Sequence, residues 1–172
     1  IEEVLKNWKQ TPNHKPIVIK GVRQCGKTSS VMDFAEKNYR HVVYLDFREH
    51  PEYRNFFIPN LDIPSIILRI SATIPNMEIE AKETCFVFDE IQDCPRARGA
   101  LKYFYLDGNY EVMCTGSLLG VNGYKTKEEL QDESEASIPV GFEQIENMYP
   151  MDFEEWLLSN NIKPIHLTYL RK

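Results

Sequence analysis

Residues 15–37 read KPIVIKGVRQCGKTSSVMDFAEK, and the order of residue types in this stretch decides the fold class. Residues 16–19 form a short apolar run that predicts a buried strand. The pattern Gly-x-x-x-x-Gly-Lys-Thr follows at residues 21–28, and apolar side chains then recur at helical spacing over 31–35. A strand, a glycine loop, a lysine, a hydroxyl and a helix are together the parts needed to hold a polyphosphate.

Each part of this phosphate loop has a physical role. Glycines let the backbone wrap closely around an anion, and the start of a helix adds unpaired N–H groups and a favourable dipole. We expect Lys27 to reach the β- and γ-phosphates of a nucleotide and Thr28 to place its hydroxyl on Mg²⁺. The residues predicted to contact the nucleotide are Gly21, Val22, Arg23, Gln24, Cys25, Gly26, Lys27, Thr28 and Ser29.

Length and composition favour one globular domain with a substantial core. The chain has 172 residues, of which 42% are hydrophobic. Its net charge of −6 disfavours sequence-independent binding to a nucleic-acid backbone, which depends on clustered Lys and Arg. No stretch approaches the roughly 20 apolar residues needed to span a bilayer, so we expect no membrane span and a cytoplasmic protein.

The four cysteines indicate a reduced protein. Cys25, Cys85, Cys94 and Cys114 include no C-x-x-C pair, so the spacing of a zinc site is absent. Cys85 and Cys114 lie in apolar, strand-like runs and are predicted to be buried small hydrophobic residues. A disulfide between them would require that their two strands are neighbours.

Apolar strands alternate with helical patterns along the chain. The predicted strands are 16–19, 41–47, 84–90 and 109–117, with 142–150 as an edge strand. The predicted helices are 1–10, the segment from the loop to about 39, 48–57, 62–74 and 94–108, and a last one opened by Asp152 and Glu155 as a capping box. This order predicts an α/β fold, a three-layer phosphate-loop NTPase sandwich with a mostly parallel central sheet.

The domain organisation is expected to have three parts. Residues 1–160 are predicted to form the nucleotide-binding domain, and the polar, acid-rich segment at about 120–137 a mobile surface insertion. Neither end of the chain resembles a natural terminus. We therefore expect residues 161–172 to begin a linker to a further, C-terminal domain.

The strand at 84–90 ends in Asp89 and Glu90, which supply what a phosphate loop lacks. Parallel sheets place their sites at the carboxyl ends of strands, so Asp89 should lie beside Thr28 and orient Mg²⁺. Glu90 could then polarise the attacking water. The structural alternative is a pair of solvated acids at the end of a strand.

The strand at 109–117 ends in Thr115, Gly116 and Ser117, a polar turn that could contact the γ-phosphate or the water. Ser117 is favoured because Gly116 frees the backbone before it, and an ordinary turn is the alternative. The predicted catalytic residues are Lys27, Glu90 and Ser117, and the predicted metal ligands are Thr28 and Asp89.

Four segments together resemble one known family. IKGVRQCGKTSS (19–30), FVFDEIQDCP (86–95), LKYFYLDGNYEVMCTGSLLG (101–120) and IPVGFEQIENMYPMDFEEWL (138–157) look like the prokaryotic AAA-superfamily ATPases of the archaeal/bacterial ATP-binding type. The resemblance implies an AAA-like core with ATP and Mg²⁺ as ligands, followed by a C-terminal domain with restriction-nuclease-like features. It gives the phosphate-loop residues, Asp89, Glu90 and the turn at 115–117 the roles described above.

This chain departs from the family pattern at two places. Many relatives carry an arginine after the glycine that precedes the last strand, where this chain has Gly141 followed by Phe142. The acidic insertion at 122–137 is also longer than usual in the family.

ATP hydrolysis that drives a conformational switch or motor is the leading hypothesis. A nucleotide-binding interaction module with little turnover and a small-molecule kinase are the alternatives. Arg23, Arg96 and Arg98 are candidates for the arginine that completes such sites, although we expect solvated surface roles for them. An arginine supplied by a second copy would require a homo-oligomer, and any nucleic-acid binding is assigned to the C-terminal domain.

Overall fold

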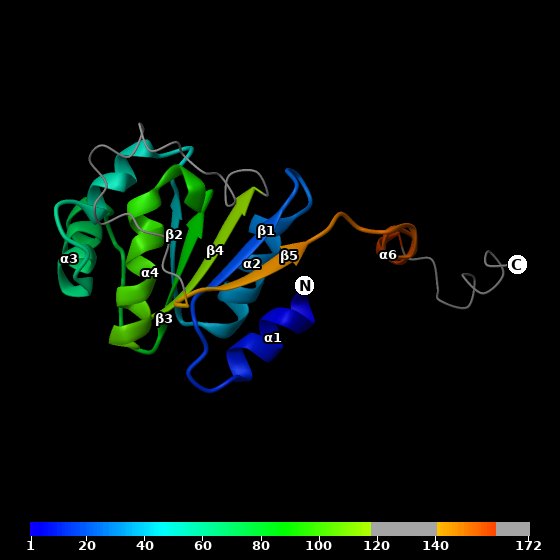
Figure 1. Cartoon of the computed structure of the whole chain (residues 1–172), viewed down its shortest axis with the longest axis horizontal. Helices are drawn as coiled ribbons and strands as arrows, with labels where there is room; N and C mark the ends of the chain where they lie inside the picture. Colours follow the sequence, from blue (N-terminus) through cyan, green and yellow to red (C-terminus); the bar gives the residue numbers. More distant parts are fainter. Residues whose placement is uncertain (118–140, 161–172) are drawn as a thin grey trace, which may run out of the picture.

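A computed structural model describes residues 1–117 and 141–160 of the chain. Its strands are β1 (Ile17–Gly21), β2 (His41–Asp46), β3 (Thr84–Asp89), β4 (Glu111–Ser117) and β5 (Gln144–Met148). They form one sheet in the order β2-β3-β4-β1-β5, and every neighbouring pair is parallel. The predicted α/β class is confirmed, and the sheet is parallel throughout (Figure 1).

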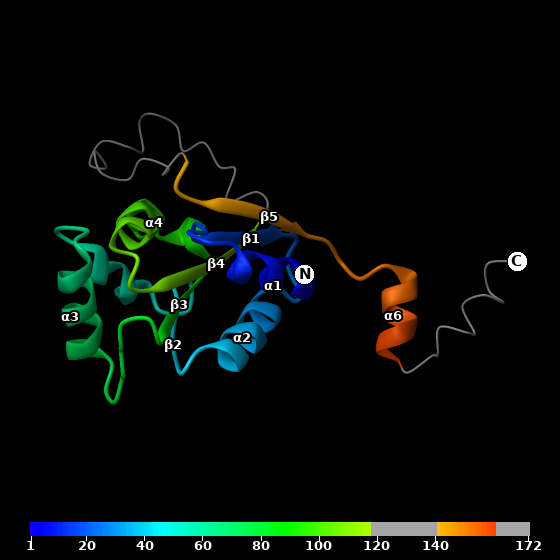
Figure 2. The same ribbon diagram turned by 90° about the horizontal axis from the view of Figure 1, so that it is seen from below.

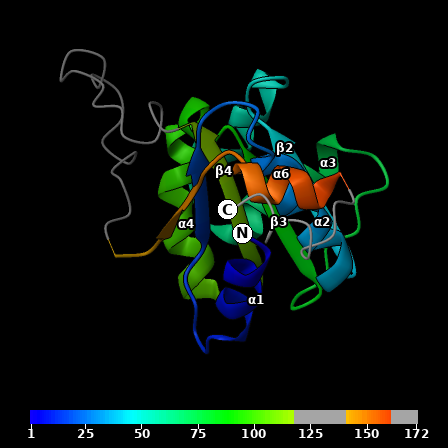
Figure 3. The ribbon, with the colours of Figure 1, turned by 90° about the vertical axis from the view of Figure 1, so that its right-hand side faces the viewer.

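Helices cover both faces of this sheet. The α-helices are α1 (Glu2–Gln10), α2 (Lys27–Asn38), α3 (Ile63–Thr73), α4 (Pro95–Asp107) and α6 (Phe153–Ser159), and the 3₁₀ helices are η1 (Pro51–Phe57) and η2 (Ile91–Asp93). In Figure 3 the central strands lie between α4 on the left and α2 on the right. Helix α6 lies beyond β5 and apart from the sheet in two perpendicular views (Figures 1 and 2).

Two apolar cores separate the three layers. Alternate residues of a strand point to opposite faces, so Val18 of β1 joins the core under α3 and α4 while Ile17 and Ile19 join the core under α1 and α2. The same division holds in β3, where Phe86 belongs to the first core and Val87 to the second. Strands that are buried on both faces explain why their sequences read as continuous apolar runs.

The predicted helix at 48–57 is the one element that forms differently. Its helical part is the 3₁₀ helix η1, which begins at Pro51 and ends at Phe57. Arg69 and Arg96 donate to the carbonyl oxygens of Phe56 and Phe57, each over 2.8 Å, so the last turn has side-chain partners in place of further helical ones. Tertiary contacts therefore override the helical pattern here.

Two of the predicted helices begin at side chains that cap them, and the predicted capping box is confirmed. Asp62 accepts a hydrogen bond from the backbone N–H of Ser65 over 3.0 Å at the start of α3. Asp152 and Glu155 form the reciprocal capping box of α6, with N···O distances of 2.8 and 3.0 Å.

The cysteines are free, as expected of a reduced protein. Strands β3 and β4 are neighbours, but Cys85 is opposite Glu111 and Cys114 is opposite Phe88. The two thiols therefore do not meet, and both are buried.

Two predictions lie outside the described residues: the insertion at about 120–137 and the linker at 161–172. Within residues 1–117 and 141–160, no helix combines the length and apolar character needed to cross a bilayer.

Candidate nucleotide site

The candidate site lies at the edge of the sheet where the strands end. Because the strands are parallel, the phosphate loop after β1 and the acidic residues after β3 meet at this one edge. Gly21 is in register with Ser117, and Asp46 with Asp89. The two sequence motifs, about sixty residues apart, therefore become neighbours in space.

The phosphate loop has the backbone geometry of an anion cradle. Gly26 has φ of +90° and Gln24 has φ of +62°, both in the left-handed region, and α2 begins directly after Gly26. Alternation of left- and right-handed residues turns successive N–H groups toward one point. A Cβ on Gly21 would lie 2.2 Å from the carbonyl oxygen of Met148, so only glycine allows β5 to approach the loop this closely.

Lys27 is held over the centre of this loop. The residue is only 7% exposed, and its Nζ donates to the carbonyl oxygens of Gly21 and Val22 over 3.2 and 2.7 Å. The loop backbone therefore positions the ammonium group beside the N–H groups that would face an anion. A compact charge at this place matches the role expected of a phosphate-binding lysine.

A pocket of about 310 Å³ opens at the loop. It is lined by six of the nine predicted contact residues together with one acid: Arg23, Gln24, Gly26, Lys27, Thr28, Ser29 and Glu90. The remaining three predicted residues are not part of this lining: Gly21 and Val22 accept hydrogen bonds from Lys27, and the Cys25 thiol is 3.8 Å from the carbonyl oxygen of Met148.

Asp89 is the centre of a cluster of hydroxyl groups. Thr28 donates to its two carboxylate oxygens over 3.1 and 3.0 Å, and the Thr115 hydroxyl donates to Oδ1. The Tyr44 hydroxyl donates to Oδ2 over 2.7 Å, and the backbone N–H of Glu90 donates to Oδ1 over 3.0 Å. Asp89 is only 5% exposed, and these donors compensate for the burial of its charge.

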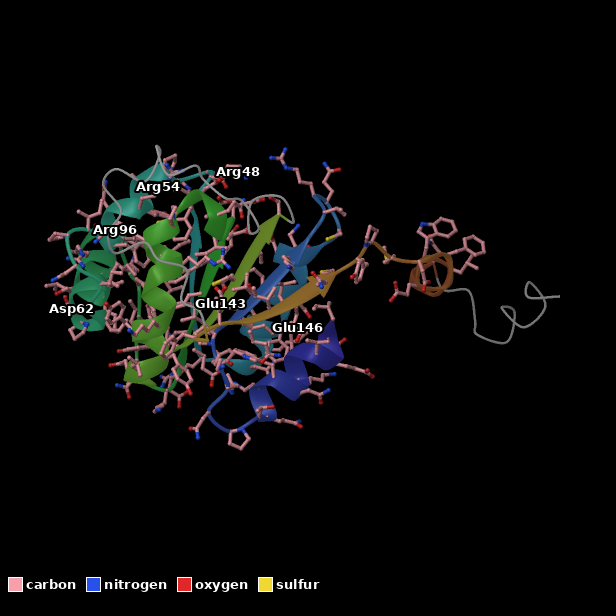
Figure 4. All side chains as sticks on the ribbon, in the orientation of Figure 1. Arg48, Arg54, Asp62, Arg96, Glu143 and Glu146 are labelled. Carbon is pink, nitrogen blue, oxygen red and sulfur yellow. The ribbon has the colours of Figure 1, made fainter. Side chains whose placement is uncertain are left out.

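Glu90 lies on the pocket wall, and its backbone has a left-handed conformation that residues other than glycine rarely adopt. Its φ is +52°, and such outliers are often found at functional sites. Arg48 pairs with its Oε2 over 3.0 Å, and Gln92 donates to the same oxygen. Arg48 also bonds Asp93 over 2.9 Å, so it links both acids at the end of the sheet where Figure 4 labels it.

Thr115, one of the two polar candidates of β4, donates a hydrogen bond to Asp89. Thr115 and Ser117 are two residues apart in the strand and therefore point to one face; Thr115 is fully buried, and Ser117, the last residue of the strand, is in register with Gly21 of the loop. The role predicted for Ser117, a contact with the γ-phosphate or the attacking water, stays a prediction.

Two of the three arginines considered for the site are engaged elsewhere in the chain. Arg96 donates to the carbonyl oxygens of Phe57 and Pro59 over 2.8 and 2.7 Å. Arg98 forms a two-bond ion pair with Glu143, at 3.0 and 2.6 Å, which ties α4 to the start of β5. Arg23 alone of the three lines the pocket.

Tyr44 and Arg48 also contact the acids of the site, although no sequence pattern predicted them. Both belong to β2 or the turn directly after it, and neither lies in a recognisable motif. The available signal was the polar residues Tyr44 and Asp46 two apart in an apolar strand, since this spacing places them on one face. Burial and the hydrogen bond to Asp89 raise the pKa of the Tyr44 phenol, which keeps it a proton donor.

The side chains fit a magnesium ion that is shared with phosphate groups. In the described part of the chain, no group of three or more His, Cys, Asp or Glu residues could hold a metal alone. Mg²⁺ commonly takes one or two protein oxygens and completes its shell with phosphate and water. The Thr28 hydroxyl and the Asp89 carboxylate, in contact at the pocket, supply that small donor set.

Comparison with solved structures finds partial matches of low identity. A DNA replication initiation factor matches with 16% identity and a TM-score of 0.46, over 95% of this chain and 50% of its own. A Bacteroides Pif1 helicase in complex with ADP-AlF3 and single-stranded DNA matches with 15% identity and a TM-score of 0.48, over 88% and 42%. AMPPCP-bound DnaA from Aquifex aeolicus matches with 15% identity and a TM-score of 0.46, over 94% and 51%.

This chain thus spans about half the length of these structures. No curated protein sequence is significantly similar to it. A family model described as an AAA domain matches residues 13–157, which include the phosphate loop, the two acids and all five strands. The chain therefore belongs to the AAA domain family.

Proposed function

We propose that this domain binds ATP with Mg²⁺ in the phosphate-loop pocket and hydrolyses it, and that the nucleotide state drives a conformational change. The observation that carries this proposal is that Lys27, Thr28 and Glu90 line one pocket, with Asp89 in hydrogen-bond contact with Thr28. Lys27 and Thr28 come from α2, Asp89 ends β3, and Glu90 follows it.

Each side chain has a separate task in this proposal. Lys27 and the loop N–H groups bind the β- and γ-phosphates, and Thr28 with Asp89 holds the metal. Bound Mg²⁺ would neutralise charge on the phosphate oxygens and so favour attack of water at the γ-phosphorus, with ADP as the leaving group. Glu90 accepts the proton of that water, for which its place on the pocket wall is suitable.

The positive charge that completes such a site could come from two sources. Arg23 lines the pocket from within the loop. A second copy of the chain could also donate an arginine, which makes a homo-oligomer part of this proposal.

Calorimetric titration with a non-hydrolysable ATP analogue and Mg²⁺ tests the binding step. We expect Lys27→Ala to weaken binding by roughly 100-fold, since hydrogen bonds to charged groups contribute about 1.5–3 kcal/mol each. Lys37→Ala is the matched control, because Lys37 lies at the far end of the same helix in an exposed pair with Asp33. Equal affinity of the Lys27→Ala variant and the wild type would contradict the proposed site.

Glu90→Gln separates hydrolysis from the two alternative functions. A hydrolase should lose turnover while the variant still binds ATP. An interaction module would show no turnover to lose, and a small-molecule kinase would form ADP only when an acceptor hydroxyl is supplied, with the phosphoryl group on the acceptor and no free phosphate.

A further inference from the structure

Tyr44 lies next to the candidate metal site although it belongs to the strand at the edge of the sheet. Strand β2 pairs with β3 so that Tyr44 is opposite Val87 and Asp46 is opposite Asp89. Residues opposite each other in a parallel pair point to the same face, and this face is the one that α2 covers. The Tyr44 ring therefore packs beneath α2 while its hydroxyl reaches the end of β3.

The hydroxyl makes a short bond to one oxygen of Asp89. The distance from the Tyr44 oxygen to Oδ2 is 2.7 Å, whereas the same hydroxyl is 3.5 Å from Oδ2 of Asp46. Asp89 is therefore its main partner. Thr28 also donates to Oδ2, but Thr28 is itself proposed as a metal ligand.

This distinction gives Tyr44 a separate role. A hydroxyl that binds the metal does so through a lone pair, so removing the Thr28 hydroxyl would remove a metal ligand together with a hydrogen bond to Asp89. The phenol of Tyr44 can keep its bond to Asp89 throughout, because each carboxylate oxygen has two lone pairs. Partners of this kind orient a metal-binding carboxylate and are commonly needed for full metal affinity.

We propose that Tyr44 is a positioning residue that holds Asp89 in the orientation that receives Mg²⁺ and its water shell. This inference rests on the proposed function, since it assigns a task within the same site. The ring and the hydroxyl contribute separately: the ring packs in the core under α1 and α2, and the hydroxyl acts on Asp89.

The chain offers a matched control for removal of a phenol hydroxyl. Tyr39 is also partly buried in the core under α1 and α2, and its hydroxyl also donates to a carboxylate, that of Glu111. Glu111 is the first residue of β4, so this pair lies at the opposite edge of the sheet from the pocket. Tyr39→Phe and Tyr44→Phe therefore remove the same group from similar surroundings, and only one of them borders the site.

The experiment measures binding of a fluorescent ATP analogue as a function of Mg²⁺ concentration, and its affinity in EDTA. We expect Tyr44→Phe to raise the Mg²⁺ concentration at half-saturation by roughly tenfold, as is typical for loss of such a partner, and to leave the affinity in EDTA unchanged. Tyr39→Phe should match the wild type in both measurements. Tyr44→His retains a ring N–H donor and should give an intermediate value, and it carries the test if Tyr44→Phe does not fold.

Two outcomes would overturn the inference in different ways. If the wild type binds the analogue but Tyr44→Phe needs the same Mg²⁺ concentration as Tyr39→Phe, or a lower one, Tyr44 does not position Asp89 and the proposed function stands. If the wild type and Lys27→Ala both fail to bind the analogue, the proposed function and the inference fall together.

Discussion

The two edges of the sheet, one at the carboxyl ends of the strands and one at their amino ends, each hold a carboxylate that accepts a hydrogen bond from a tyrosine, yet the two carboxylates differ in how their charge is balanced. At the carboxyl edge, Asp89 accepts from Tyr44 and from other hydroxyl groups, all of which are neutral. At the amino edge, Glu111 accepts from Tyr39 and pairs with His14 over 3.1 Å. In the part of the chain that the structure describes, no cationic side chain forms an ion pair with Asp89.

A pocket alone does not distinguish these two edges. Glu111 and His14 border one of about 420 Å³, which is larger than the phosphate-loop pocket of about 310 Å³. The source of the balancing charge does distinguish them. Glu111 has an ionic partner within the chain, whereas Asp89 has none among the described residues, which is consistent with its proposed role as a metal ligand.

The largest expected difference follows from removing each charge. Asp89→Asn should lower ATP turnover by at least about 100-fold, because the site loses the carboxylate that orients the metal. Glu111→Gln should leave turnover unchanged and lower the free energy of unfolding by about 1–2 kcal/mol, through its weakened bonds to Tyr39 and His14. Steady-state phosphate release and urea unfolding measure the two effects.

A fall in turnover for both variants would mean that the two edges are coupled. Unchanged turnover in Asp89→Asn would remove Asp89 from the site. The proposed difference between the two carboxylates requires that Asp89→Asn lowers turnover and that Glu111→Gln lowers only stability.

The parts of the site that the sequence predicted are those that are contiguous in the chain. The phosphate loop and the Asp89–Glu90 pair carry their chemistry in a few consecutive residues, after apolar runs that predict strands. The parallel order of those strands then requires the two motifs to meet. Fold class, helix caps and the edge position of β5 follow from similarly local signals.

The missed residues depend on strand register, which no local pattern specifies. Tyr44 reaches Asp89 only because β2 pairs with β3 so that Asp46 is opposite Asp89. The contact of Thr115 with Asp89 depends on register in the same way, since β4 pairs with β3 so that Cys114 is opposite Phe88. The structure of η1 likewise depends on distant partners, the side chains of Arg69 and Arg96.

A smaller difference in ATP turnover is expected from replacing an arginine at each of the two edges. Arg48 pairs with Glu90 beside the pocket over 3.0 Å, and Arg40 pairs with Glu80 at the amino edge over 3.4 Å. Both are partly exposed pairs, worth at most about 1 kcal/mol, which is roughly fivefold in rate. Arg48→Met should therefore lower turnover by up to roughly fivefold with unchanged ATP affinity, and Arg40→Met should leave both unchanged.

Steady-state kinetics with a parallel binding titration separates these cases. A higher turnover in Arg48→Met would show that Arg48 restrains Glu90 and does not orient it. A lower affinity would show that Arg48 acts on the bound nucleotide.

The smallest effect concerns the amino edge, where the ion pair makes stability depend on pH. The hydrogen bond to Glu111 raises the pKa of His14 above its ordinary value of 6.5. Burial works to raise the pKa of Glu111, but the hydrogen bonds from His14 and Tyr39 outweigh it and bring that pKa below 4.5. The contribution of His14 to the free energy of unfolding is complete below pH 6.5 and is lost as the pH rises through the pKa of His14 in the folded protein. The contribution of Glu111 is complete above pH 4.5 and is lost as the pH falls through the pKa of Glu111 in the folded protein.

Both contributions are therefore present together between about pH 4.5 and 6.5. His14→Gln should lower the unfolding temperature by about 2–4 °C at pH 5.5, which corresponds to about 1 kcal/mol in a chain of this size, and by less at pH 9. Thermal unfolding of the two proteins at both pH values measures this change, with His50→Gln as the control, because His50 pairs with Glu52 on the exposed surface. An equal loss at pH 5.5 and pH 9 would mean that His14 stabilises the fold only through its neutral contacts with Trp8 and Thr11, and that the charge of Glu111 is not balanced from within the chain.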